Sequence, residues 1–289
     1  MKHLSLCSGI GGLDLAAEWA GFETIALCEI DDYASKVLAK NFKGVPNLHD
    51  IRTVTNERLR EYGFNPAEIT VISAGFPCQP YSLAGKGRGD SDERDLWGEV
   101  ARVLGEVKPQ WFVGENTPGL FSRENQRYFR RVLNDLTALG YSVGWGIWGA
   151  CDVGANHKRE RVFLFAFNPD SKRRDEVRVQ NRKSCQKVDE TSEREFSGAS
   201  RLFDNVSDTN GTREQQPQRS EQNKRRRTCD CNWWQTEPDV GRVANGIPAR
   251  VDRLRCLGNA VVPAQAYPIF EAIAQYESGA CENPPQKTR

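Results

Sequence analysis

The chain has 289 residues, of which 38% are hydrophobic and 27% are charged, and its formal net charge is +1. This is enough apolar material for one large core with a smaller lobe attached. The overall charge does not point to a nucleic-acid partner, so any basic surface has to be local. The nine cysteines include no Cys-x-x-Cys pair, and we expect a reduced, cytosolic protein without a metal. The absence of a long apolar run argues against a membrane span and a signal peptide.

The first residues predict a strand, a glycine turn and a helix. An apolar run over residues 3–7 leads directly into Gly-Ile-Gly-Gly at 9–12, and residues 13–20 have helical composition before a further glycine. This arrangement lets backbone amides and a helix N-terminus approach a ligand. Because the full G-x-G-x-x-G spacing is missing, tight packing in any α/β domain explains the glycines about as well.

Acidic residues follow the next two predicted segments. Glu29 stands at the C-terminal end of a strand over residues 24–28, roughly 20 residues after the glycine turn, as the ribose-binding acid of nucleotide folds does. A capping acid ahead of a helix over residues 33–41 is the alternative. Asp50 lies at the end of a third short segment, where it can accept a hydrogen bond from an adenine amino group or serve only as a turn aspartate.

The stretch over residues 71–82 organises the middle of the chain. Its first residues favour a buried strand, and Pro77 then fixes its own φ and restricts the residue before it. Cys78 therefore lies at a stiff strand-to-loop corner, which suits a nucleophile that must be aimed. The loop over residues 83–94 is rich in glycine and charge, which is typical of a mobile, phosphate-facing segment. Considered alone, a cysteine of this kind is more often buried and inert.

A second strand end supports a site at this corner. The strand predicted over residues 111–116 ends on Glu115 and Asn116. If it runs parallel to the strand before Cys78, both ends lie where ligands bind in open α/β sheets. Further elements are expected as helices over 96–107, 126–139 and 264–276, and as a hairpin of strands over 141–148 and 161–167 whose Arg161 can point along the sheet edge.

Composition changes after residue 168. Aliphatic residues are sparse as far as residue 232, and a basic run, Lys-Arg-Arg-Arg, occupies 224–227. This segment predicts either a small polar recognition lobe or a partly disordered insertion, and a solvated linker explains its middle nearly as well. Order is expected to return at Trp233, and the last residues have the composition of a loose tail.

Five blocks in this order resemble the cytosine-5 DNA methyltransferase family. They are Cys-Ser-Gly-Ile-Gly-Gly (7–12), Gly-Phe-Pro-Cys-Gln-Pro-Tyr-Ser (75–82), Glu-Asn-Thr (115–117), Lys-Arg-Glu-Arg (158–161) and Gly-Asn-Ala-Val-Val-Pro (258–263). The resemblance implies a Rossmann-like class I methyltransferase sheet with helices on both faces, plus a small irregular target-recognition lobe. The implied domains are a catalytic and cofactor-binding domain at 1–167, the variable lobe at 168–232, a return segment at 233–276 and a tail at 277–289.

The resemblance also implies a reaction, methyl transfer from S-adenosylmethionine to carbon 5 of a flipped-out cytosine in double-stranded DNA. Cys78 would add to carbon 6, and Glu115 would hydrogen-bond the ring nitrogen and help to protonate the ring. Arg161 would hold the carbonyl oxygen, supported by Arg159. The implied catalytic set is Cys78, Glu115, Arg161, Arg159, Pro77 and Asn116.

The implied S-adenosylmethionine pocket joins both ends of the chain, with Glu29 on the ribose, Ile30 against the adenine and Asp50 on its amine. The family commonly has Phe at the position of Cys7, so one apolar wall is expected to be smaller here. The full implied cofactor set is Cys7, Gly9, Ile10, Gly11, Gly12, Glu29, Ile30, Asp50, Asn259 and Ala260. The implied DNA contacts are Ser82, Lys86, Arg88, Arg225 and Arg226.

Other functions remain open at this point. An RNA methyltransferase of the same family is the nearest alternative, and the variable lobe favours DNA only weakly. A non-catalytic DNA-binding relative is a second, although Cys78, Glu115 and Arg161 are all present. We expect a monomer of prokaryotic or phage origin, belonging to a restriction-modification system.

Overall fold

The computed structural model describes residues 1–77, 95–122, 125–171 and 248–279. The predicted nucleophile, the glycine-rich loop after it and almost all of the predicted recognition lobe lie outside these ranges, so the domain boundaries stay a prediction. The predicted site residues outside the described chain are Cys78, Ser82, Lys86, Arg88, Arg225 and Arg226.

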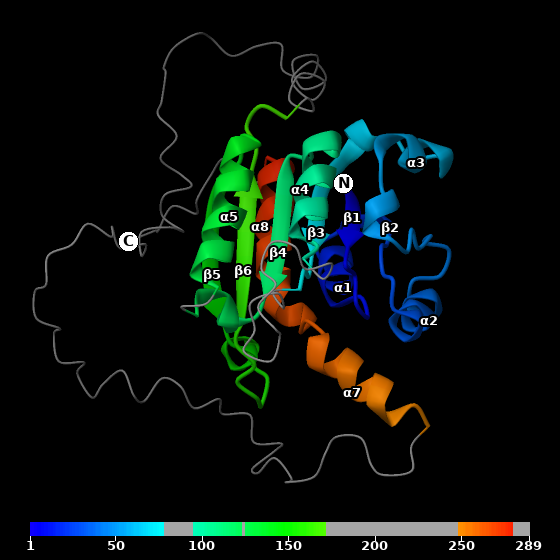
Figure 1. The fold of residues 1–289 in the computed structure, drawn as a ribbon, viewed down its shortest axis with the longest axis vertical. Helices are drawn as coiled ribbons and strands as arrows, with labels where there is room; N and C mark the ends of the chain where they lie inside the picture. The colour runs from blue at the N-terminus through cyan, green and yellow to red at the C-terminus, as the bar shows by residue number, and fades with distance from the viewer. Residues whose placement is uncertain (78–94, 123–124, 172–247, 280–289) are drawn as a thin grey trace, which may run out of the picture.

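Within the described residues, six strands form one sheet in the order β2-β1-β3-β4-β6-β5 (Figure 1). The first four run parallel, β6 runs antiparallel to β4, and β5 pairs with β6 as a hairpin. The expected α/β class and the expected hairpin are both confirmed. The strands are β1 (Lys2–Leu6), β2 (Glu23–Ala26), β3 (Ile69–Ala74), β4 (Trp111–Asn116), β5 (Ser142–Trp148) and β6 (Arg161–Phe167).

Helices cover both faces of this sheet. In Figure 1, α4 and α5 lie in front of the strands, and α8, in red, lies behind them. The α-helices are α1 (Gly12–Trp19), α2 (Asp32–Asn41), α3 (Asn56–Glu61), α4 (Trp97–Val107), α5 (Gln126–Ala138), α7 (Arg250–Asn259) and α8 (Pro263–Glu277). Short 3-10 turns are η1 (Ile51–Thr53), η2 (Pro66–Glu68), η5 (Pro118–Phe121) and η6 (Ala150–Val153).

The two helical layers follow from the period of the strands, whose successive side chains point to opposite faces. Ile72 and Phe112 belong to the large core under α4 and α5. Their chain neighbours Val71 and Val113 belong to the second core, against α1 and α8. Because α8 packs on α1, the C-terminal helix of the described chain buries the first one.

An ionisable pair is buried on the α1 side of the sheet. His3 is fully buried, with its two ring nitrogens 3.0 Å from Thr24 Oγ1 and 2.8 Å from Ser73 Oγ. Asp14 Oδ1 lies 4.0 Å from His3 Nδ1. Burial lowers the pKa of His3 to about 3 and raises the pKa of Asp14 to about 7. The Ser5 hydroxyl offsets only part of the rise at Asp14, and the pair is therefore expected to be neutral in weakly acidic solution.

Two parts of the chain could not be described in detail from the sequence. The third short segment, before Asp50, forms an isolated bridge between Leu27 and Asn47 and then the 3-10 turn η1. Helix α7 was not predicted; none of its side chains is buried, and its apolar residues Val251, Leu254 and Leu257 are exposed within the described part of the chain. None of the described helices is both long and apolar enough to cross a membrane.

Candidate active site

Three strand ends meet at one edge of the sheet. Strands β3 and β4 are parallel, and β6 runs the opposite way, so the ends of β3 and β4 lie beside the start of β6. Beyond β3 the chain turns at Gly75, where a Cβ, if one were present, would lie 3.5 Å from Glu115 Oε2. Pro77, two residues further on, is the last described residue before Cys78. The Glu115 carboxyl therefore faces the corner that leads to the predicted nucleophile.

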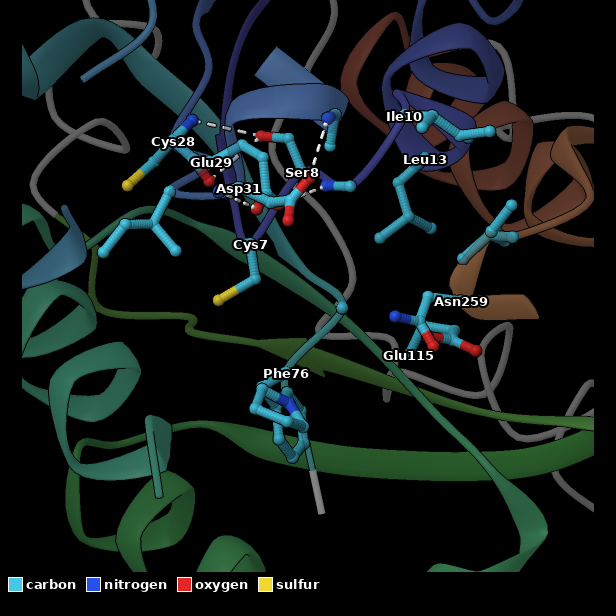
Figure 2. Close-up of a pocket in the computed structure, with 18 of the residues that line it drawn as sticks. Cys7, Ser8, Ile10, Leu13, Cys28, Glu29, Asp31, Phe76, Glu115 and Asn259 are labelled. Atoms are coloured by element: carbon cyan, nitrogen blue, oxygen red, sulfur yellow. Dashed lines mark hydrogen bonds between the residues drawn. The ribbon is translucent and has the colours of Figure 1, made fainter. Parts of the chain in front are cut away.

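A cavity of about 690 Å³ opens at this edge, within the size range of small-molecule sites. Figure 2 shows its walls, with Cys7 and Glu29 from the N-terminal turns, Asn259 from the end of α7, and Glu115 from β4. Members of both predicted sets therefore share one cavity. Its lining includes Cys7, Gly9, Ile10, Gly12, Glu29, Ile30, Asp50, Pro77, Glu115, Asn116, Arg161, Asn259 and Ala260.

Glu29 ties the glycine turn to the start of α2. Its Oε2 accepts a hydrogen bond from the Gly9 amide at 2.7 Å, and its Oε1 accepts one from the Asp31 amide at 2.8 Å (Figure 2). Burial raises its pKa above the ordinary value. The helix cap itself is Asp31, whose carboxylate accepts from Tyr33 and Ala34. Each carboxylate oxygen of Glu29 keeps a second lone pair, so it can still accept from a hydroxyl group in the cavity.

Gly11 differs from its neighbours in the predicted cofactor set. It does not line the cavity; its φ is +89°, and a Cβ there would lie 2.3 Å from the Phe42 ring. Its missing side chain therefore lets the turn pack against α2. At Gly12 a Cβ would lie 2.5 Å from the Val261 carbonyl oxygen, so this glycine lets the return segment approach the turn. Both glycines thus allow close packing, and Gly12 also lines the cavity.

Asp50 and Ile30, the next two residues of the predicted cofactor set, line the cavity in different structural settings. Asp50 accepts a hydrogen bond from the Arg52 amide at 3.0 Å and so caps η1, while also lining the cavity. Ile30 makes part of the wall although its side chain is 61% exposed. An exposed apolar side chain at the mouth of a cavity offers a surface to the face of an aromatic ring. Ile30 and Asp50 thus present an apolar surface and a carboxylate to the same cavity.

Glu115 and Arg161 form the charged part of the site. Glu115 is 7% exposed, and its Oε1 lies 3.0 Å from Arg161 Nε. Burial raises the pKa of Glu115 to about 7, because the attraction of Arg161 and Arg159 offsets only part of the desolvation. A carboxyl group with a pKa near 7 can both donate and accept a proton at neutral pH, as a general acid requires.

Arg159 does not line the cavity. Its backbone has a φ of +32°, and its guanidinium donates to three carbonyl groups at the end of α7, those of Leu257 (3.1 Å), Gly258 (2.8 Å) and Ala260. A cation is favourable there because the C-terminus of a helix carries partial negative charge. Arg159 thus contacts the return segment and has a smaller electrostatic effect on Glu115, and its supporting role in the reaction stays a prediction.

Two polar side chains hold the ends of the 78–94 segment. Asn116 Nδ2 donates to the Phe76 carbonyl at 3.0 Å. The Tyr128 hydroxyl lies 3.4 Å from the Pro77 carbonyl and 3.3 Å from Asp95 Oδ1. One hydroxyl thus contacts the residues on both sides of this segment. Tyr128 was missed in the sequence, where it is only one aromatic residue of an amphipathic helix.

The return segment closes the cavity opposite the strand ends. Arg255 and Cys256 line it from α7, and Arg255 Nη2 lies 2.5 Å from Asp31 Oδ2 at the start of α2. Neither was predicted, because the helix that presents them was not. Among the residues that the structure describes, no group of His, Cys, Asp and Glu side chains could hold a metal ion.

Known proteins share much of this sequence. The sequence matches the family model described as C-5 cytosine-specific DNA methylase over residues 1–245. It is 38% identical over 171 residues to the Type II methyltransferase M.FnuDI of Fusobacterium nucleatum, covering 59% of this chain and 48% of that protein. It is 37% identical over 171 residues to the Type II methyltransferase M.NgoBI of Neisseria gonorrhoeae, covering 58% of this chain and 50% of that protein.

A solved structure is similar as well. A crystal structure described as a DNA modification methyltransferase encoded within an E. coli prophage superposes with a TM-score of 0.51 at 28% identity, covering 58% of this chain and 47% of that one. The chain spans about half the length of the curated relatives it matches. The family model, by contrast, covers most of the chain, including the block around Cys78. The chain belongs to the C-5 cytosine-specific DNA methylase family.

Proposed function

We propose that this protein transfers a methyl group from S-adenosylmethionine to carbon 5 of a flipped-out cytosine in double-stranded DNA. The observation that carries the proposal is the position of Glu115. It is buried, paired with Arg161, and faces the corner before Cys78 from the wall of the nucleotide-sized cavity. A proton donor and a cation at one cavity, with a thiol next in the sequence after Pro77, are the groups that this chemistry needs.

Each group has a separate task in the reaction. The Cys78 thiolate adds to carbon 6 of the cytosine and makes carbon 5 nucleophilic. Glu115, whose pKa is about 7, donates a proton to the ring nitrogen as the thiolate attacks. Arg161 hydrogen-bonds the carbonyl oxygen and stabilises the charge that develops there. Once carbon 5 carries the methyl group, its proton passes to solvent water, the ring nitrogen returns its proton to Glu115, and the Cys78 thiolate leaves. A base inside a stacked duplex cannot be reached in this way, so the cytosine has to be flipped out.

The cavity fits S-adenosylmethionine at several points. Gly11 provides no side-chain cap for α1, so the first turn of this helix can bind the carboxylate of the cofactor's methionyl part through its backbone amides. Glu29 can accept from the ribose hydroxyls, with Ile30 and Asp50 on the adenine. When bound, the cofactor supplies the activated methyl group. The residues of this chain orient it and separate it from water, with Asn259 and Ala260 completing the wall.

The DNA partner and the domain roles are part of the same proposal. The relatives named above are Type II methyltransferases, which supports a bacterial DNA-modifying activity. The lobe at 168–232 would select the sequence through major-groove contacts. Its basic run, with Arg225 and Arg226, would add phosphate affinity, and Ser82, Lys86 and Arg88 would contact the DNA beside the flipped base.

The test traps the covalent adduct. A cytosine fluorinated at carbon 5 cannot lose a proton there after methylation, so the full-length protein with S-adenosylmethionine and fluorinated DNA should give a complex that survives a denaturing gel. Cys78→Ser should give none. Cys151→Ser, at a cysteine of intermediate exposure that does not line the cavity, should behave like the wild type. An adduct on another cysteine, or equal trapping on single-stranded RNA with the same sequence, would refute the assignment.

A further inference from the structure

The side chain of Gln265 contacts the backbone at both sides of the β5–β6 connection. It lies near the start of α8 and is fully buried. Its Nε2 donates one hydrogen bond to the Trp148 carbonyl at 2.9 Å and another to the Arg159 carbonyl at 3.0 Å. Trp148 is the last residue of β5, and Arg159 stands two residues before the start of β6. The amide thus joins the two ends of this connection.

Packing alone does not explain why residue 265 is a glutamine. Its Oε1 is buried and has no hydrogen-bond partner within the described part of the chain, and an unpartnered buried oxygen is unfavourable. An apolar side chain of the same length would avoid that cost. The two carbonyl groups give the reason for an amide, because both N–H groups of Nε2 are used, and the reverse orientation would place Oε1 against two carbonyl oxygens.

Gln265 binds the backbone at Arg159, two residues before Arg161, and this backbone determines the position of the Arg161 side chain. Arg159 has a φ of +32°, in the left-handed region that non-glycine residues rarely adopt. Two residues later, Arg161 lies 3.0 Å from Glu115. In the other direction, the Arg159 guanidinium binds carbonyl groups at the end of α7, next to Asn259. The contact is therefore reciprocal, since a side chain from each segment binds the backbone of the other.

We propose that Gln265 is a positioning residue for methyl transfer. By fixing the Arg159 backbone it holds the Arg161 guanidinium against Glu115, and it couples this catalytic pair to the segment that completes the cofactor cavity. This role rests on the proposed function, since it concerns the reactivity of the same site. It is separate from binding of the cofactor itself, because Gln265 does not line the cavity.

The test compares two substitutions at this position with one matched control. Gln265→Met keeps the size of the side chain and removes both donors. Gln265→Glu places a carboxylate against two carbonyl oxygens, and only its protonated form restores one donor. Gln275→Glu makes the same chemical change at an exposed position of α8. Methyl transfer to DNA, adenosylhomocysteine binding, and the NMR titration of Glu115 are measured in each protein, after circular dichroism has shown that it is folded.

Gln265→Met should lower kcat about tenfold or more at every pH, with the Kd for adenosylhomocysteine changed by less than about threefold. Gln265→Glu should approach the wild-type rate more closely as the pH falls, and Gln275→Glu should match the wild type. In Gln265→Met the Glu115 titration should move to higher pH, because a displaced Arg161 attracts the carboxylate less. If Gln265→Met does not fold, Gln265→Asn, which keeps the amide on a shorter side chain, replaces it.

Two results separate the proposals. A wild-type protein without methyltransferase activity would contradict the proposed function, and the Glu115 titration would still test the positioning role. Unchanged kcat and an unchanged Glu115 titration in folded Gln265→Met would overturn the positioning role alone. An equal loss of kcat at all pH values in Gln265→Glu and Gln265→Met, without any shift of the Glu115 titration, would leave Gln265 as a packing residue and also refute the inference.

Discussion

Replacing Glu115 with glutamine should make the protein more stable in alkaline solution while removing its activity. Folding raises the pKa of this carboxyl from 4.5 to about 7, chiefly because the group is desolvated. An acid with a raised pKa binds more protons in the folded state than in the unfolded state. Its contribution to stability is therefore fully present below the unfolded pKa and is lost as the pH rises through the folded pKa. Glutamine does not titrate, so the stability of Glu115→Gln should not fall with pH for this reason.

The size of the effect follows from the two pKa values. Between pH 5.5 and pH 8.5, the free energy of unfolding of the wild type should fall by about 2 kcal/mol relative to Glu115→Gln. The full change over all pH values is about 3 kcal/mol. Little discount for solvent applies, since Glu115 is 7% exposed. Methyl transfer should drop by at least about 100-fold, because an amide cannot deliver the proton.

Urea unfolding followed by tryptophan fluorescence at the two pH values measures this difference. His3 and Asp14 also titrate abnormally, but both proteins carry them, so their contribution cancels in the comparison. Cys78→Ser serves as the control for inactivity, since it keeps Glu115 and should follow the wild-type pH dependence. A difference in stability that does not change with pH, or a Glu115→Gln protein that is less stable than the wild type at pH 8.5, would contradict the electrostatics described here.

Three further outcomes are expected. The wild type should lose up to about 4 kcal/mol of stability as the pH rises from the unfolded pKa of Asp14, 3.8, through its folded pKa of about 7, and Asp14→Asn should not show this loss. Urea titrations at a series of pH values measure the free energy of unfolding of both proteins. The same dependence of this free energy on pH in both proteins would refute the prediction. Tyr128→Phe should cost about 1 kcal/mol of stability and lower kcat without weakening adenosylhomocysteine binding. The reason is that the hydroxyl contacts Pro77 and Asp95, the residues on either side of the 78–94 segment. An unchanged kcat would exclude that role. Arg255→Ala should weaken adenosylhomocysteine binding about two- to fivefold in low salt and less in high salt, since the ion pair with Asp31 is partly exposed; calorimetry at two salt concentrations tests this, and an effect independent of salt would argue against the ion pair.

The strand ends were the most predictable part of the structure. Alternating or continuous apolar runs stopped by glycine, proline or a carboxylate identify β1, β3 and β4 from the sequence, and parallel pairing then brings Glu115 to the corner before Cys78. These are local signals combined with one topological rule. The cavity residues Glu29 and Asp50 were predicted on the same basis, since each follows the end of a short apolar segment.

The parts that were missed depend on contacts between distant segments. Gly11 has the same sequence signature as its neighbours in the turn, and only the position of the Phe42 ring shows that this glycine packs against α2. Gln265 is one polar residue in a mostly apolar helix, and its partners lie more than a hundred residues earlier in the chain. No periodic pattern encodes such a contact, because it requires the register between α8 and the β5–β6 connection.

The place of α8 against α1 has a consequence for how the protein is made. The apolar side of α1, including Leu13 and Ala17, is buried by α8, and the glycine turn is in contact with Val261. During synthesis the ribosome produces the N-terminal strands and the cofactor turn long before their covering helix. Until α8 has been synthesised, the apolar side of α1 in the nascent chain is therefore uncovered and at risk of aggregation. A ligand that binds across the joined ends, as proposed for S-adenosylmethionine, would favour them by mass action after release and so assist the last step of folding.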